Sequence, residues 1–325
     1  MLEISDLRTE FHTRRGVVHA VNGVSFGVPE GRLIGVVGES GCGKSVTVRS
    51  LIGLVRPPGK VVGGTATFQG RDLLAMHQRE RRKLLGAGIG FVGQQPFASL
   101  NPVLSIEKQF ANLIRAHRPR TSRAEIRALT LSKLSDTGIA GPERVLEGYA
   151  HQLSGGMAQR VLIAMAMALD PALVIADEPT TALDVTVQRQ ILDLIRQMLA
   201  GGERSMLLVT HDLGVVAHYC DAVVVMYAGK VVEKGAVRDV FRNPAHPYTA
   251  ALLRAVPRPD RRIQGLRGTL PDLVDYPVGC PYAARCDSVT DRCLTEAPAA
   301  TEVRQRDVAC HHPVQEGAAY VAAQN

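Results

Sequence analysis

Hydrophobic positions at the start of the chain follow the two-residue period of β-strands. Apolar residues mark three such stretches: Leu2, Ile4 and Leu7, then Val17–Val21, then Val24–Val28. Glu30-Gly31 is expected to turn the chain. The run Arg32–Val37 is then mostly apolar and β-branched, which is typical of a parallel strand buried on both faces. The pattern predicts an antiparallel β region followed by a buried strand.

The pattern then changes to the period of helices. Lys44–Leu54 has helical spacing and is expected to stop before Pro57-Pro58-Gly59, after which Gly63–Phe68 returns to strand character. Between Ser99 and Gln152, apolar residues again recur at helical intervals: Ile106, Phe110, Leu113, Ile114, Ile126, Leu129, Leu131 and Leu134. We interpret this segment as an inserted helical subdomain.

Helices and strands alternate in the remainder. We expect strands at Ala172–Ala176, Ser205–Val209, Ala222–Met226 and, after a hairpin turn at Ala228-Gly229, Lys230–Glu233. We expect helices over Gly156–Leu169 and through Val187, Ile191, Leu194, Ile195 and Met198. This alternation indicates an α/β fold with a parallel sheet covered on both faces. Beyond about Arg242 the composition shifts to Pro, Arg and Cys, which predicts a separate appendage.

Composition narrows the class of protein. At 325 residues the chain can build a large core and one or two smaller subdomains. The hydrophobic fraction of 46% and charged fraction of 21% are those of an ordinary globular protein. No apolar stretch reaches the roughly 18 residues of a membrane span, and the N-terminus lacks the pattern of a signal peptide. We therefore expect a cytoplasmic chain.

The net charge of +7 favours an anionic partner, either a nucleic acid or a membrane surface. The basic clusters Arg79–Lys83 and Arg254–Arg267 lack interleaved aromatic residues, and the chain has no Trp. We interpret these clusters as solvated faces and expect no nucleic-acid partner.

Gly38–Ser45 fits the phosphate-loop pattern G-x-x-x-x-G-K-S and lies between a predicted strand and a predicted helix. Its glycines let backbone N–H groups turn toward phosphate oxygens, and the helix N-terminus adds positive charge. Lys44 is expected to contact the β- and γ-phosphates, and the Ser45 hydroxyl to ligate Mg²⁺. The expected ATP-binding residues are Gly38, Glu39, Ser40, Gly41, Cys42, Gly43, Lys44, Ser45 and Val46.

An acidic pair ends the predicted strand Ala172–Ala176. Asp177 is expected at the carboxyl edge of the sheet, where it would hold Mg²⁺. Glu178 would face the γ-phosphate and act as general base on the attacking water, an effect of about 10²–10⁴-fold. A helix N-cap turn is the alternative for an isolated Asp-Glu-Pro, and the complete phosphate loop favours the catalytic interpretation.

Two further polar residues follow predicted strands. Gln94, after Ile89–Val92, would reach Mg²⁺ or the water, and Gln95 is its rival. His211, after Met206–Thr210, would bond the γ-phosphate and orient Glu178 or water, although a lone histidine is more often structural.

The segment Leu153-Ser154-Gly155-Gly156-Met157 is a second small-residue turn at a helix start, and so a second candidate anion site. Phosphate loop, Leu-Ser-Gly-Gly and acidic pair, in this order, resemble the ATP-binding-cassette (ABC) ATPases over roughly the first four-fifths of the chain. The resemblance implies a head-to-tail dimer in which this signature segment closes on the partner's ATP. It also implies a D-loop at Asp184 that crosses the dimer interface, and an adenine-stacking role for Phe11, for which a strand Phe in the core is the alternative.

The resemblance implies a P-loop NTPase fold with a RecA-like parallel core and an antiparallel β subdomain. We expect the ATP-binding core in 1–98 and 157–242, the helical subdomain with the signature in 99–156, and a Cys-rich extension in 243–325.

A closer resemblance, to ATPase subunits of bacterial oligopeptide and dipeptide importers, rests on Asn243–Thr249 (Asn-Pro-Ala-His-Pro-Tyr-Thr), Ala176–Thr186 and Val225–Gly229. It implies a second ATPase subunit, identical or homologous, two transmembrane permeases and, indirectly, an extracytoplasmic peptide-binding protein. The chain would then lie at the cytoplasmic face of the membrane. Relatives in this group also import nickel or glutathione, so the cargo stays open.

Four of the six cysteines fall in the extension, at Cys280, Cys286, Cys293 and Cys310. Structural disulfides are disfavoured in the cytoplasm. The C-x₂₋₄-C pairs usual for zinc are missing. The resemblance implies a cysteine quartet that holds a [4Fe–4S] cluster in some members. We expect a cluster first, zinc second and free thiols third, with His311-His312 open as additional ligands.

These observations predict the ATPase subunit of a peptide importer, in which ATP binding closes two cassettes and hydrolysis reopens them. A soluble cassette ATPase acting on nucleic acid or ribosomes is the rival, favoured by the basic charge and opposed by the single cassette and the importer-like tail. A nucleotide-binding regulator is a third alternative, and it would require loss of Glu178.

Overall fold

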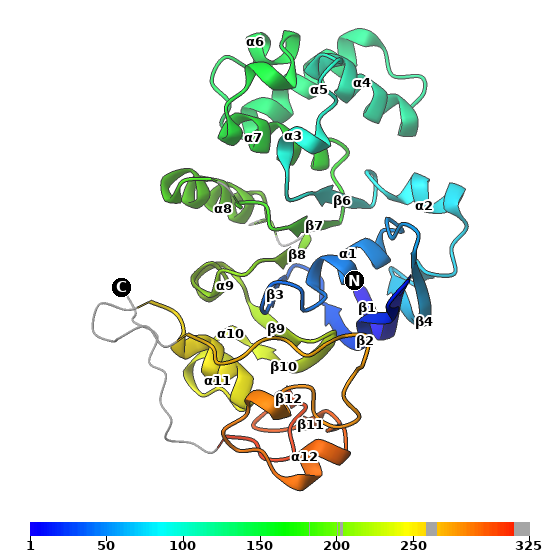
Figure 1. Ribbon diagram of the computed structural model, residues 1–325. Coiled ribbons are helices and arrows are strands. Elements are labelled where there is room, and N and C mark those ends of the chain that lie inside the picture. Colours follow the sequence, from blue (N-terminus) through cyan, green and yellow to red (C-terminus); the bar gives the residue numbers. More distant parts are fainter. Residues whose placement is uncertain (182, 200, 202–203, 258–264, 315–325) are drawn as a thin grey trace. The chain divides into compact units, whose positions relative to one another are not determined.

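The computed structural model describes residues 1–181, 183–199, 201, 204–257 and 265–314 (Figure 1). Parts of three expected segments lie outside the described residues: Ala182 before Asp184, residues 258–264 of the basic cluster, and residues 315–325 of the extension. The chain forms two compact units. The first comprises Met1–Val28, Leu33–Ala75 and Val209–Asn325, and the second comprises Pro29–Arg32 and Met76–Leu208.

The first unit begins with an antiparallel sheet in the order β2-β1-β4-β5. Its strands are β1 (Leu2–Thr13), β2 (Gly16–Val28), β4 (Gly59–Phe68) and β5 (Arg71–Asp72). The predicted alternation is confirmed, since Leu2, Ile4 and Leu7 are at most 1% exposed. Apolar burial on one face holds this sheet in register.

The other strands of the first unit are ordered β11-β12-β10-β9-β3. They are β3 (Leu33–Val37), β9 (Ala222–Tyr227), β10 (Lys230–Ala236), β11 (Thr301–Glu302) and β12 (Asp307–Val308). Strands β3 and β9 are parallel, and β9 and β10 are antiparallel. The helices of this unit are α1 (Lys44–Leu51), α9 (Leu213–Tyr219), α10 (Val237–Arg242), α11 (Pro247–Arg254), η2 (Ala283–Arg285) and α12 (Asp291–Thr295).

Helix α1 ends three residues before the predicted end. Gly53 adopts a φ of +69°, and the N–H groups of Gly53 and Leu54 donate to the carbonyls of Ser50 and Arg49. This arrangement of a left-handed glycine and two reversed hydrogen bonds is a Schellman motif. Glycine therefore ends the helix before Pro57 is reached.

The extension is not a separate appendage, and that expectation was wrong. Strand β12 pairs with β10, at Val308 against Glu233. Arg306, with a side chain 2% exposed, lies 3.5 Å from the buried Glu233 carboxylate. Weak periodicity gave no sign of this because the packing joins segments distant in sequence.

The second unit holds strands in the order β8-β7-β6, with β6 (Ile89–Val92) parallel to β7 (Leu173–Asp177) and β8 spanning Ser205–Val209. Its helices are α2 (Gln78–Leu84), α3 (Pro96–Ser99), α4 (Ile106–His117), α5 (Arg123–Asp136), α6 (Pro142–Glu147), η1 (Ala150–Gln152), α7 (Gly155–Ala166) and α8 (Val185–Leu199). Helices α4 to α7 gather around one core that includes Ile106, Phe110 and Ile126 (Figure 1). The predicted helical character of 99–152 is confirmed.

Among the described residues, no helix combines the length and the apolar character needed to span a bilayer. The longest, α8, has 15 residues.

Candidate functional site

The residues of the expected ATP site lie in both compact units. In the first unit, the fully buried strand β3 leads into the phosphate loop. Gly38 and Gly43 have φ values of +152° and +102°. A Cβ at Gly38 would lie 2.2 Å from the Met226 carbonyl oxygen, and one at Gly43 would lie 2.3 Å from that of Ala20. Backbone conformation and lack of space therefore both require glycine.

Lys44 is buried at the start of α1. Its Nζ donates hydrogen bonds to the carbonyl oxygens of Gly38 and Glu39, at 2.7 and 2.9 Å. The N-cap residue, Gly43, has no side chain to bond the first-turn amides, which include those of the half-buried Ser45 and Val46. The loop thus combines an ammonium group and a helix N-terminus at one place, which suits a polyphosphate.

Cys42, where the motif permits any residue, is fully buried. Burial raises the pKa of its thiol, so the group stays protonated and serves packing. Ser40 and Gly41 are exposed on the same loop.

The C-terminal extension touches the phosphate loop, which the sequence did not predict. The backbone N–H of Glu39 donates to Tyr248 Oη at 2.9 Å. Arg285 Nη1 donates to Glu39 Oε2 at 3.1 Å and lies 3.0 Å from Oε1. The Asn243–Thr249 segment was noticed only as a family marker, and Arg285, 246 residues away, carried no signal.

His211 and Phe11 also lie in the first unit. His211 is exposed between β8 and α9, next to Asp212, whose side chain caps α9. Phe11 is half-buried on β1, and its ring lies over Gly59, where a Cβ would approach within 2.6 Å of Cε1. One face of the Phe11 ring therefore packs against β4.

The second unit carries the acidic pair. Asp177 is the last residue of β7 and is 2% exposed. Glu178 has a φ of +49°, a left-handed conformation that costs a non-glycine residue about 1–3 kcal/mol. Its Oε2 accepts from Gln94 Nε2 and from Thr181 Oγ1, both at 2.9 Å. Two donors and an unusual backbone thus fix the carboxylate in one orientation.

The same contact separates the two rival glutamines. Gln94 follows β6 and bonds Glu178, whereas Gln95 is exposed and is the N-cap residue of α3. Thr181 is a further partner of Glu178 that the sequence reasoning missed.

The signature segment starts α7, one residue earlier than predicted. Ser154 is the exposed N-cap, and its Oγ accepts from Met157 N at 3.3 Å. Leu153 is half-buried before it. A Cβ at Gly155 would lie 3.7 Å from Leu183, and one at Gly156 would lie 2.9 Å from Val187. The contact at Gly155 is an ordinary van der Waals distance, whereas Gly156 lets α7 approach the segment around Asp184.

Asp184 itself is exposed and has a local role. Its Oδ1 accepts from Val187 N at 2.9 Å, as an N-cap residue of α8 does.

The four extension cysteines line one small cavity in the first unit, of about 10 Å³, together with His246, Tyr282 and His311. Burial raises the pKa of the Cys280 and Cys286 thiols, and that of Cys310 to about 11. The donor chemistry suits a thiolate metal centre. The cavity is too small for such a centre, because about one water molecule fills a cavity of this size. In the described parts of the chain, no three His, Cys, Asp or Glu side chains are arranged to hold a metal ion.

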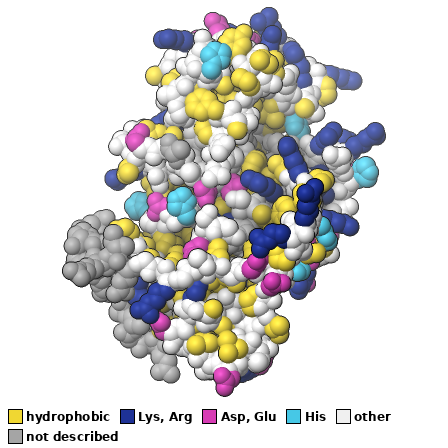
Figure 2. Space-filling view, viewed as in Figure 1, with side chains coloured by type: hydrophobic (Ala, Val, Ile, Leu, Met, Phe, Trp, Pro, Cys, Tyr) yellow, Lys and Arg dark blue, Asp and Glu magenta, His cyan; other side chains and the backbone are white. Residues whose placement is uncertain are grey.

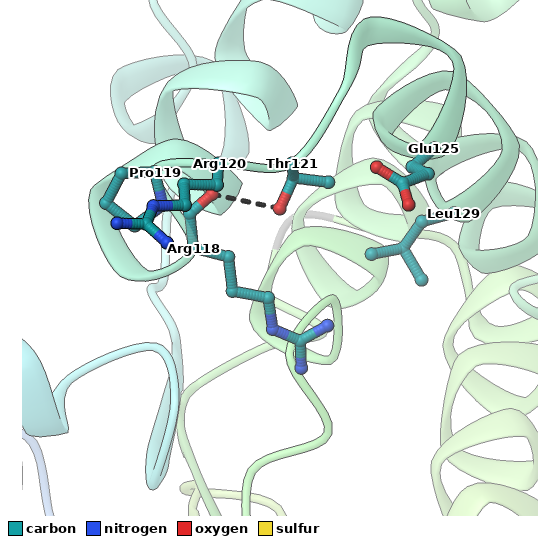
Figure 3. Close-up of a pocket in the computed structure, with 6 residues that line it drawn as sticks. All are labelled: Arg118, Pro119, Arg120, Thr121, Glu125 and Leu129. Carbon is teal, nitrogen blue, oxygen red and sulfur yellow. Dashed lines mark hydrogen bonds between the residues drawn. The ribbon is translucent and has the colours of Figure 1, made fainter.

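Basic side chains gather at two other places in the second unit, at α2 and beside α5. Dark blue side chains cover the region of α2 in Figure 2, in line with the expected solvated cluster Arg79–Lys83. A depression of about 660 Å³ beside α5 is lined by Arg118, Arg120, Thr121 and Glu125. Figure 3 shows its two arginine side chains leaving in different directions. They do not converge on one ligand position, and none of the predicted site residues lines this depression.

Comparisons with known proteins agree with these motifs. Residues 21–181 match the family model described as "ABC transporter", and residues 232–293 match "Oligopeptide/dipeptide transporter, C-terminal region". Among solved structures, the chain is similar to the dimeric post-hydrolysis state of the ATP-binding cassette MJ0796 bound to ADP and Pi. The TM-score is 0.66 and the identity 26%, over 73% of this chain and 99% of the other.

Curated relatives are similar over nearly the full length. A dipeptide transport ATP-binding protein, DppD, of Haemophilus influenzae is 41% identical over 97% of this chain and 96% of its own. The oligopeptide transport ATP-binding protein OppD of Salmonella typhimurium is 42% identical over 97% of this chain and 95% of its own. This chain therefore belongs to the ABC transporter family, as an ABC-type ATPase that carries the C-terminal region of the oligopeptide/dipeptide group.

Proposed function

We propose that this chain is the ATP-hydrolysing subunit of an importer that carries oligopeptides or dipeptides across the cytoplasmic membrane. The observation that carries the hydrolytic part is the Glu178 carboxylate, held by Gln94 and Thr181 directly after the last residue of β7. The transport part is supported by the matching C-terminal region and by relatives named for dipeptide and oligopeptide transport.

In this proposal the phosphate loop binds the ATP triphosphate, with Lys44 at its β- and γ-phosphates and Phe11 at the adenine. Ser45, Asp177 and Gln94 supply oxygen ligands for Mg²⁺, a donor set that this hard cation prefers. Mg²⁺ held by these residues would supply positive charge against the charge that develops on the phosphate oxygens.

The role of Glu178 is to accept a proton from the attacking water. Its bonds to Gln94 and Thr181 hold the carboxylate in place, so no reorganisation is needed when the water arrives. His211 would donate to the γ-phosphate or orient that water.

The proposal includes a head-to-tail dimer, supported by the similarity to cassettes solved as dimers. The exposed Ser154 and the α7 N-terminus would meet the partner's ATP, with Asp184 at the interface. ATP can close such a dimer only because it contacts both subunits in the closed state and one in the open state. Closure would act on two permease subunits, which would place the chain at the cytoplasmic face of the membrane. An extracytoplasmic binding protein would deliver cargo to the permeases.

The cysteine quartet is proposed as the ligand set of a [4Fe–4S] cluster, with zinc second. What supports it is that all four thiols line one cavity. In this structure the cavity is too small for a cluster, so the thiols would have to separate, and no step of hydrolysis is assigned to it.

Cargo separates the remaining alternatives. Nickel or glutathione import would keep every nucleotide contact and change only the permeases and the binding protein. A nucleic-acid or ribosome ATPase would be stimulated by those polymers. Co-purification with the membrane partners and ATPase assays with dipeptides, glutathione, Ni²⁺ or RNA would distinguish them.

Glu178→Gln tests the hydrolytic proposal. Because a neutral amide replaces the carboxylate that acts as the base, the ATP turnover rate should fall at least about 100-fold while ATP binding is retained. Steady-state ATPase and nucleotide titration would measure both. The matched control is Glu147→Gln, an exposed carboxylate paired with Arg127 in the same unit, which should leave turnover unchanged. Near-normal turnover of Glu178→Gln would remove Glu178 from this role.

Iron analysis tests the cluster. Protein purified without oxygen should contain about four irons per chain and be coloured, and Cys286→Ser should lose both. Zinc at one ion per chain would instead support the zinc alternative. A colourless, metal-free protein would rule out both metals.

A further inference from the structure

Glu39, the second residue of the phosphate loop, is held through three of its groups. Its N–H donates to Tyr248 Oη, and its carboxylate is paired with Arg285. Its carbonyl oxygen accepts from Lys44 Nζ at 2.9 Å. One residue therefore joins the loop lysine to two side chains of the C-terminal extension.

Several contacts hold Arg285. Its side chain is 5% exposed, its Nε donates to the Arg267 carbonyl at 2.6 Å, and Nη1 also donates to Tyr227 Oη at 3.1 Å. Its guanidinium carbon lies 5.6 Å and 5.9 Å from the ring centres of Tyr227 and Tyr282. An ion pair so enclosed is screened little by solvent and has one geometry.

Tyr248 is equally constrained. It is fully buried, and its ring lies 4.6 Å from Tyr227 and 5.4 Å from Tyr282, centre to centre. Burial raises the pKa of its hydroxyl, so the group stays neutral and accepts the Glu39 N–H without competing charge. The two extension side chains thus bind one loop residue, Tyr248 at its backbone N–H and Arg285 at its carboxylate.

We propose that Arg285 and Tyr248 are positioning residues for nucleotide binding, which set the conformation of Glu39 and, through its carbonyl oxygen, the position of Lys44. The inference rests on the proposed binding of ATP to this loop. It gives the extension a part in forming the ATP site, beyond any part in transport or metal binding. Before phosphate arrives, Lys44 Nζ donates to two carbonyl oxygens of the loop and, at 3.8 Å, to Cys42 Sγ, and one of the two carbonyl oxygens belongs to Glu39.

The test is ATP titration and steady-state ATPase of the full-length protein with Arg285→Gln, Arg285→Lys and Tyr248→Phe. Arg285→Gln should raise the ATP dissociation constant and KM about tenfold, the scale of one hydrogen bond to a charged group, with kcat at saturating ATP within about twofold. Arg285→Lys should recover part of the loss, since it keeps the charge without the fork. Tyr248→Phe should weaken binding by about threefold to tenfold.

A double-mutant cycle tests whether Arg285 acts on ATP binding through its ion pair with Glu39 or only by holding the extension against the rest of the unit. Glu39→Gln should weaken ATP binding about as much as Arg285→Gln, and the double variant should be no worse than either, because both remove one ion pair. Additive losses would overturn the inference. The control is Arg292→Gln, which breaks the exposed Arg292–Glu296 pair of the same extension and should leave ATP affinity unchanged.

Should Arg285→Gln fail to fold, Arg285→Lys and Tyr248→Phe still decide the matter, and wild-type ATP affinity in both would overturn it. A wild-type protein that binds no ATP would instead defeat the proposed function itself. The two failures are therefore distinguishable.

Discussion

The phosphate loop and the signature segment are both glycine-containing turns that open a helix, yet they are built in different ways. Before α1, Gly43 is left-handed, has no side chain to cap the helix, and packs against the backbone of distant strands. Before α7, Ser154 is extended and exposed, and its own hydroxyl caps the helix. One turn depends on the whole unit around it, and the other is encoded locally.

The difference bears on what each turn can bind. Helix N-terminal amides attract anions, and a side-chain cap already occupies one of them. The phosphate loop leaves its first-turn amides without such a cap and adds a buried lysine. The signature segment has no lysine and keeps Ser154 at the surface. The first is a site within the chain, and the second is a surface suited to meeting the ATP of another copy.

Gly43→Ala, in the phosphate loop, should have the largest effect. A Cβ would force a left-handed alanine, at about 1–3 kcal/mol, and would clash with the Ala20 carbonyl. ATP affinity should fall by about tenfold or more, as measured by nucleotide titration. Gly141→Ala is the control, since Gly141 is also left-handed, at φ +65°, but has open space around its Cβ position. Equal ATP affinity in the two variants would contradict the close packing of the loop.

Ser154→Ala should have a smaller and conditional effect. Loss of the cap costs α7 about 0.5–2 kcal/mol of stability. Under the dimer proposal, ATPase activity at saturating ATP should fall several-fold, while a dilute monomer binds ATP as before. Ser105→Ala is the matched control, because Ser105 caps α4 in the same way outside the signature segment. Equal activity of the two variants would deny Ser154 a role beyond capping.

The smallest effect concerns another locally encoded helix start, that of α5. Ser122 and Glu125 form a capping box, and hydrogen bonds from the Ser122 backbone and side chain lower the pKa of Glu125 below 4.5. A lowered pKa means that this contribution is present above 4.5 and is lost as pH falls through the lowered value. The protection factor of the first-turn amides of α5, which is the exchange rate of the free peptide divided by the measured rate, should therefore fall in acid, and Glu125→Gln should remove that dependence. Glu143→Gln is the control, at α6, where Gly141 provides no side-chain cap. An unchanged pH profile in Glu125→Gln would assign the effect to another group.

The sequence was sufficient for features that are local. Period-two and helical patterns placed most strands and helices, and the phosphate-loop spacing located Lys44 and its strand-to-helix context. Asp177 was expected at the end of its strand and is found there.

Features that depend on distant packing were missed. The early end of α1 was missed for a different reason: the left-handed Gly53 ends the helix through local hydrogen bonds, whereas the prolines that follow were expected to stop it. Strand β12 is two residues long, too short for any period, and it pairs with β10 next to a buried ion pair between Arg306 and Glu233. The Thr181 bond to Glu178 and the Arg285 bond to Glu39 are single contacts, which composition does not record.

The grip of Arg285 and Tyr248 on Glu39 has a practical consequence for anyone shortening this protein. A version trimmed after residue 242 would retain every motif by which a nucleotide-binding chain is recognised. It would also lack both side chains that hold the second residue of the phosphate loop. Kinetic constants from such a fragment would describe a different enzyme.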